Sequence, residues 1–149
     1  MISCLFGAVC QSSLLAMVVL LLCNSRVGFT SGPGSPVDGP IQAFQWNNGL
    51  LSTAPTSQSA ATYAFPGGML AISANGTTNG ILWAVQRINA TTAGVLHAYK
   101  ATDLGVELYN SNQAGSRDTL DIAAKFNIPL VANGKVYVAS VSQLTVYGQ

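Results

Sequence analysis

Short apolar runs alternate with turn residues along most of this chain. After residue 40, runs rich in Val, Ile, Leu, Tyr and Thr are interrupted by Gly and Asn, which is typical of β-strands joined by turns. No stretch repeats apolar residues at the spacings of three and four that indicate an amphipathic helix. The pattern therefore predicts an all-β fold, with strands at Ile41–Trp46, Leu70–Ser73, Ile81–Gln86, Val95–Ala101, Val106–Tyr109, Phe126–Val131, Lys135–Ala139 and Gln143–Tyr147.

Two turns between these strands are predicted from residue type. Asn133-Gly134 separates two apolar runs, and both central positions of a type I′ hairpin turn need the positive φ that Asn and Gly tolerate. Asp103-Leu104-Gly105 is the second predicted turn, between Val95–Ala101 and Val106–Tyr109. An Asn-Gly pair also occurs at Asn75-Gly76, 58 residues before the first, which indicates a repeated unit.

The runs Ile81-Leu82-Trp83 and Val95-Leu96 are continuously apolar rather than alternating. A strand with one wet face alternates, whereas a continuous run indicates a strand covered on both faces. Sheets stacked between neighbouring sheets would provide that cover. If the stack is incomplete, one face bearing residues such as Ile81, Trp83 or Val138 is expected to lack a partner.

The first 40 residues differ from the remainder. No charged side chain precedes Arg26, and Leu14 to Cys23 is a ten-residue apolar run that fits the core of an export signal. The sequence predicts an apolar N-terminal helix within 1–30, either a signal peptide or a membrane anchor, and an extracytoplasmic chain. A mis-assigned start is the third interpretation. Residues 31–40, SGPGSPVDGP, have the composition of a linker.

Composition excludes several classes of protein. The 149-residue chain is 49% apolar, only 7% charged, and carries a net charge of +1. It is therefore neither a disordered chain nor a basic nucleic-acid binder. All three cysteines, Cys4, Cys10 and Cys23, precede the linker, which leaves no disulfide framework or cysteine metal site beyond it.

The sequence contains no recognisable catalytic set. His97 is the single histidine, with Asp103 six residues away, so we interpret it as a hydrogen-bonded structural residue. The densest group of charges, a candidate binding loop, comprises Arg117, Asp118, Asp121 and Lys125. The alternative is a solvated connection with weak local ion pairs. Asp118 or Asp121 is a candidate calcium ligand, although the regular spacing of a dedicated calcium loop is missing.

The closing segment VANGKVYVAS, followed by QLTVYG, resembles the blade repeat of bacterial quinoprotein-like (pyrroloquinoline-quinone-like) β-propellers. ISANGTTNGILWAV, LHAYKATDL and ELYNSNQ look like the final blades of such proteins. The resemblance implies a partial β-propeller over 41–149, with about two to two and a half four-stranded antiparallel blades, since a blade takes about 40 residues. It also implies a C-terminal fragment of a larger ring, because the smallest ring has about four blades.

The resemblance gives three hypotheses on function. The first is a non-catalytic structural or interaction module of an exported propeller, which associates with missing blades, another protein or itself. The second is a fragment of a quinoprotein-like oxidoreductase that is inactive without the rest of its ring. The third is a truncated gene product. No cofactor is expected, because the cysteine pair and calcium ligands of a quinone site cannot be assembled; pyrroloquinoline quinone would belong to a full-length relative.

Two segments, Asn75-Gly76-Thr77 and Asn89-Ala90-Thr91, match the pattern for N-glycosylation. In a bacterial chain, which the resemblance implies, they would carry no meaning.

Overall fold

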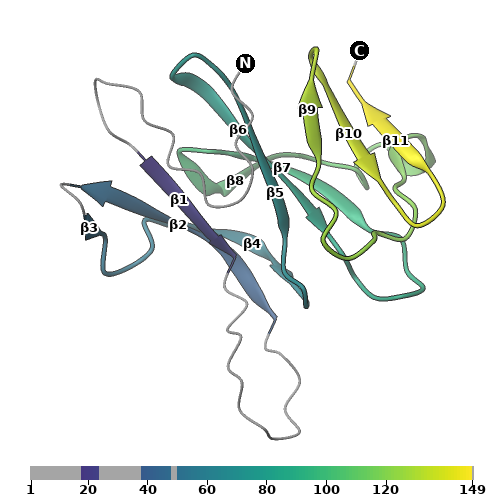
Figure 1. Ribbon diagram of the computed structural model, residues 1–149, viewed down its shortest axis with the longest axis horizontal. Coiled ribbons are helices and arrows are strands. Elements are labelled where there is room, and N and C mark those ends of the chain that lie inside the picture. Colours follow the sequence, from purple (N-terminus) through teal and green to yellow (C-terminus); the bar gives the residue numbers. More distant parts are fainter. Residues whose placement is uncertain (1–17, 24–37, 48–49, 149) are drawn as a thin grey trace, which may run out of the picture.

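Three antiparallel sheets make up the computed structural model, which describes residues 18–23, 38–47 and 50–148 (Figure 1). Sheet A contains β1 (Val18–Cys23), β2 (Gly39–Asn47), β3 (Leu50–Leu51) and β4 (Ser57–Tyr63). Sheet B is a meander of β5 (Met69–Asn75), β6 (Thr78–Gln86), β7 (Val95–Lys100) and β8 (Asp103–Asn110). Sheet C contains β9 (Leu130–Ala132), β10 (Lys135–Ala139) and β11 (Leu144–Tyr147), and a short 3₁₀ helix, η1 (Gly115–Asp118), lies between sheets B and C in sequence. The all-β prediction is confirmed.

Sheet B is covered on both of its faces. One apolar cluster joins it to sheet A and contains Ile41, Ala43, Tyr63, Leu82, Ala84, Tyr99 and Leu104. A second cluster joins it to sheet C and contains Val85, Leu96, Leu120, Ala123, Val136, Val138 and Tyr147. Burial of one such side chain contributes roughly 1.5–3 kcal/mol, so the two clusters are the main source of stability. The continuous apolar run predicted to need two covers is β7, where all five residues of 95–99 are buried.

The Asn133-Gly134 turn is confirmed. Asn133 has a φ of 51° and Gly134 a φ of 72°, and Ala132 pairs with Lys135 across the turn. The other predicted turn is wrong: Lys100 pairs with Asp103, so Asp103-Leu104-Gly105 lies inside β8. Leu104 is fully buried between sheets A and B, and this burial outweighs the turn preference of its neighbours.

Two further strand predictions need correction. Residues 57–63 form β4, although SQSAATY has too few large apolar residues to be recognised; its inward positions are filled by small Ser59 and by Tyr63. The strand expected at Phe126–Val131 begins only at Leu130. Phe126 has a φ of 62°, which is incompatible with an extended strand, and Pro129 has no N–H to donate to a neighbour.

The predicted N-terminal helix is wrong where the structure describes it. Val18–Cys23 is a strand that pairs residue by residue with Ile41–Trp46 of β2. Two successive valines favour an extended chain, and β2 offers a free edge for pairing. The remainder of the predicted leader and residues 31–37 of the linker lie outside the described residues, and β2 already begins at Gly39. Within the described part, no helix is long and apolar enough to cross a membrane.

Candidate functional site

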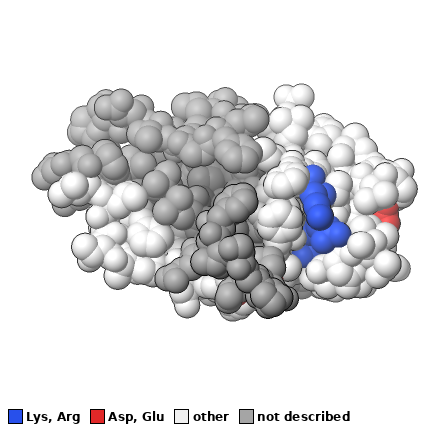
Figure 2. All heavy atoms as spheres, turned by 60° about the horizontal axis from the view of Figure 1, so that its bottom comes forward, with Lys and Arg blue, Asp and Glu red and all other residues white. Residues whose placement is uncertain are grey.

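The connection between sheets B and C carries all four residues of the predicted binding loop. It runs through residues 111–129 and includes η1, which lies beside β11 (Figure 1). Figure 2 shows one face of the molecule, on which Lys and Arg side chains form a narrow strip beside uncharged residues. The four loop residues do not converge on one point. They make three separate sets of contacts, each of which fastens the loop to a different part of the fold.

Asp118 and Arg117 make the first set of contacts. Arg117 Nε donates to Asp118 Oδ1 over 2.7 Å, and the Tyr109 hydroxyl donates to Asp118 Oδ2 over 2.6 Å. The bonds from Arg117 and then Tyr109 lower the pKa of the Asp118 carboxyl to about 2. The Tyr147 hydroxyl donates to the Asp118 carbonyl oxygen, and burial, followed by the Asp118 charge, raises the pKa of Tyr147 to about 12. Asp118 therefore links β8 to β11.

Asp121 makes the second set of contacts, with the turn between β10 and β11. Its Oδ2 accepts hydrogen bonds from the Ser142 hydroxyl at 2.6 Å, the Ser142 N–H at 3.2 Å and the Ser140 hydroxyl at 3.4 Å. The Ser142 hydroxyl bond is the largest of the causes that lower the pKa of Asp121. This carboxylate orders the β10–β11 turn. Asp118 and Asp121 are the candidate calcium ligands. No group of three or more His, Cys, Asp or Glu side chains that could hold a metal ion occurs in the described part of the chain.

Lys125 makes the third set of contacts. Its ammonium lies 5.4 Å from the centre of the Phe65 ring, in the range of a cation–π interaction. Phe65 and Phe126 meet edge to face, with ring centres 6.3 Å apart. Lys125 thus connects the loop to the segment between sheets A and B. Taken together, the three contacts indicate a strap that joins the sheets.

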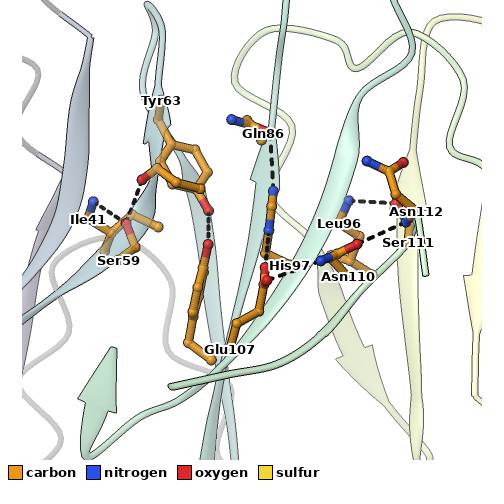
Figure 3. A network of polar contacts seen from close by, with 12 residues as sticks. Ile41, Ser59, Tyr63, Gln86, Leu96, His97, Glu107, Asn110, Ser111 and Asn112 are labelled. Carbon is orange, nitrogen blue, oxygen red and sulfur yellow. Dashed lines mark hydrogen bonds and ion pairs between the residues drawn. The ribbon is translucent and has the colours of Figure 1, made fainter. Parts of the chain in front are cut away.

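A polar network that the sequence did not predict lies between sheets A and B (Figure 3). His97 is buried, its Nδ1 lies 2.5 Å from Glu107 Oε1, and its Nε2 lies 3.1 Å from Gln86 Oε1. The Gln86 amide nitrogen donates to the Thr62 carbonyl oxygen over 2.7 Å, which leaves Oε1 to accept from His97 Nε2. Both ring nitrogens are engaged, as expected of a hydrogen-bonded histidine inside an interface.

The same network reaches sheet A through two tyrosines. The hydroxyls of Tyr63 and Tyr99 are 3.0 Å apart, and the His97 ring stacks on Tyr99 at 5.7 Å. Burial is the largest cause that raises the pKa of Tyr99. These bonds satisfy polar groups inside the interface and fix how sheet A sits on sheet B. The partner of His97 was missed because Glu107, not Asp103, lies across the β7–β8 pair, and the bulges in β8 hide this register from the sequence.

Trp83 is a packing residue. Its indole N–H donates to the Ser73 hydroxyl over 2.9 Å, and its ring packs against the cluster between sheets B and C. The side chain of Trp46 lies outside the described residues.

Sheet C presents an uncovered apolar surface. Residues of β10 alternate, so Val136 and Val138 face sheet B while Tyr137 and Ala139 face away. Tyr137 pairs with Leu130 on one side and Val146 on the other, and Ala139 pairs with Leu144. We call this surface the outer face of sheet C; it consists of Leu130, Tyr137, Ala139, Leu144 and Val146. Leu130, Leu144 and Val146 are 53%, 62% and 45% exposed.

No family model, curated protein or solved structure matches this chain. Similarity to known proteins therefore contributes nothing to an assignment of function.

The outer face of sheet C differs from the other exposed apolar side chains. Strand β8 also exposes Val106 and Leu108, but acidic Asp103 and Glu107 lie on the same strand. On sheet A, the exposed positions of β4 are Gln58, Ala60 and Thr62. On sheet C, exposed Leu130 and Val146 flank half-buried Tyr137 in one apolar row across three strands. This surface is the best candidate for a functional site.

Proposed function

We propose that this chain is a non-catalytic structural module that associates through the outer face of sheet C with the same face of a second copy. The observation that carries the proposal is the row Leu130–Tyr137–Val146, which lies in register across the sheet and is left uncovered by the residues that the structure describes. Exposed apolar patches occur at protein–protein interaction sites, and this one is small.

Charge and polarity favour pairing of sheet C with sheet C of a second copy over head-to-tail stacking, in which sheet C would pack on sheet A of the next copy. The outer face of sheet C contains one charged neighbour, Lys135, at the β9–β10 turn end, and no acidic residue. The exposed face of β4 on sheet A offers Gln58 and Thr62, which would leave amide and hydroxyl groups unpaired against leucine and valine. A two-fold pairing of sheet C with sheet C avoids that cost and closes the assembly.

The area of the outer face of sheet C determines how strongly two copies are expected to associate. Three strands of three, five and four residues, spaced about 4.8 Å apart, cover roughly 190 Å² of sheet plane. Stable protein complexes bury about 800 Å² per partner. The association should therefore be weak and dependent on concentration.

The finer identity of the module is also a proposal. We infer that the three sheets are blades of the propeller type and that the apolar leader directs export. Two features support the first inference: sheets B and C are meanders of consecutive strands, and all three sheets pack face to face. In a complete ring, the outer face of sheet C would pack on the next blade.

Sedimentation velocity over a range of protein concentrations tests the proposed function. The wild-type chain should shift towards a dimer as concentration rises. Val146→Lys, which places a charge in the centre of the surface, should remain a monomer, whereas Ala60→Lys on the opposite side of the stack should behave as the wild type. A wild-type chain that is monomeric throughout, or a Val146→Lys chain that still dimerises, would refute the proposal.

A further inference from the structure

The loop between β6 and β7 contains one of the two segments with an N-glycosylation pattern. Ile88 is 39% exposed, and every residue from Asn89 to Ala93 is exposed. The ends of the loop are held by the two strands and by a hydrogen bond from the Gly94 N–H to the Asp121 carbonyl oxygen. Asn89-Ala90-Thr91 therefore stands on a surface loop with fixed ends, which is where an acceptor asparagine must lie for an enzyme to reach it.

The side chain of Asn89 folds over the two residues that follow it. Its Oδ1 accepts hydrogen bonds from the Thr91 N–H at 2.8 Å, the Thr91 hydroxyl at 3.1 Å and the Thr92 N–H at 2.7 Å. This is an Asx turn extended by a hydroxyl bond. It brings the threonine hydroxyl of the pattern into contact with the amide of its asparagine.

The geometry has a chemical consequence for the amide nitrogen. Three donors on Oδ1 draw electron density from the amide, which makes the Nδ2–H bonds more acidic. Nδ2 itself makes no hydrogen bond with any residue that the structure describes, and it lies on an exposed side chain. Oδ1 is thus held in place while the nitrogen that would react is free.

The second segment lacks this arrangement. Asn75 is the last residue of β5 and pairs with Thr78, and Thr77 stands in the tight Gly76-Thr77 turn. The hydroxyl near Asn75 belongs to Thr78, which donates to the Asn75 carbonyl oxygen over 3.0 Å. No contact joins the Asn75 side chain to Thr77 among the described residues.

We propose that Asn89 is a site of N-glycosylation, and that Asn75 is a poorer acceptor; this rests on the export proposed above and on a source other than the bacterial one that the resemblance implies. The co-substrate is an oligosaccharide linked through its anomeric carbon to a polyprenyl diphosphate. A bond forms between Asn89 Nδ2 and that carbon, the bond from the carbon to the diphosphate oxygen breaks, and the diphosphate leaves as an anion. The proton displaced from Nδ2 passes to a base on the transferring enzyme. No oxidation or reduction takes place. The loop contributes no residue to the outer face of sheet C, so this inference does not depend on the proposed dimer.

Incubation of the purified full chain with a single-subunit oligosaccharyltransferase and a polyprenyl-diphosphate oligosaccharide tests the site directly. Intact mass should increase by one glycan, and peptide mapping should place it on Asn89. Thr91→Ala should lose the glycan, Thr91→Ser should keep it because the hydroxyl is retained, and Thr77→Ala should leave the modification of Asn89 unchanged.

Three results would overturn the proposal. The first is an unmodified Asn89 in the wild-type chain, including the case in which a free peptide of the same segment is modified, because the folded loop would then be inaccessible. The second is a glycan that persists on Asn89 in Thr91→Ala. The third is a modification confined to Asn75. Circular dichroism of each variant confirms that the chain remains folded, so a loss of glycan cannot be attributed to unfolding.

Discussion

The two faces of sheet C are alike in composition and opposite in environment. On the inner face, Val136 and Val138 are 4% and 0% exposed beneath sheet B. On the outer face, Leu144 and Val146 are 62% and 45% exposed. A strand with one wet face normally carries polar residues on that side. The outer face of sheet C is as apolar as a face that is meant to be covered, which is the reason for assigning it an interaction.

The outward side of β4 in sheet A differs from the outer face of sheet C. Strand β4 alternates in the ordinary way, with Ser59 and Tyr63 inward and Gln58, Ala60 and Thr62 outward. The interface between sheets A and B is fastened by hydrogen bonds such as Tyr63 to Tyr99, whereas that between sheets B and C is apolar and is strapped by the loop around Asp118. The outward side of β4 is therefore largely polar, whereas the outer face of sheet C is apolar.

The largest expected effect on stability comes from replacing a valine by alanine on the inner face of sheet C, compared with the same substitution on the outer face. Val138→Ala should lower the free energy of unfolding by about 2–3 kcal/mol, because it removes fully buried methyl groups and leaves a cavity. Val146→Ala should change it by no more than about 0.5 kcal/mol in dilute protein, as for other exposed positions. Urea unfolding of both variants measures the difference. Equal losses would mean that the outer face is already covered within one chain.

A smaller loss is expected from the turn that sets the register of β9 and β10. Gly134→Val should destabilise the chain by about 1–2 kcal/mol, because a β-branched residue resists the positive φ at this position. An added Cβ meets no atom within 4 Å, so the loss reports backbone conformation rather than a clash. Gly134→Asn is the matched control and should lose less. Thermal melts of the three chains decide, and an unchanged melting temperature in Gly134→Val would argue against the role of the turn.

The smallest effect concerns the strap between sheets B and C and depends on pH. The pKa of Asp118 lies at about 2, below its ordinary value of 3.8, so the folded chain binds the proton less readily than the unfolded chain. Its stabilising contribution is therefore complete above pH 3.8 and is lost as the pH falls through about 2. Asp118→Asn should make the free energy of unfolding depend less on pH at acid pH. Near neutral pH, the slope of the free energy against pH should change little. Denaturation from pH 6 to pH 2 would show it; identical slopes in both chains would exclude the carboxylate as the cause.

The sequence predicts local features of the fold better than the way its sheets stack. Continuous apolar runs identified sheet B, which is covered on both faces, and Asn133-Gly134 identified the β9–β10 turn of sheet C, because both signals are local. The predicted bare face was wrong in its residues: Val138 is buried and Trp83 packs on the cluster between sheets B and C. Which side of a short alternating strand faces the neighbouring sheet depends on how the sheets stack, and that information is not local.

The candidate site shows the same limit. The charges at Arg117, Asp118, Asp121 and Lys125 were recognised as a group, but their partners are tyrosines, serines and a phenylalanine from distant segments. Proximity in sequence therefore suggested one site where the fold makes three contacts. The His97–Glu107 contact depends on the register of two strands with bulges between them, and no spacing rule contains that register.

Photo-crosslinking from a single position tests the central claim most directly. A photoreactive amino acid at position 146 of the full chain should yield a covalent dimer whose crosslinked peptide comes from residues 130–147 of the second copy. The same amino acid at position 60, on the exposed face of β4, should yield none. Absence of dimer at position 146, or an equal yield at position 60, would contradict the assignment of the outer face of sheet C as the surface through which this module associates.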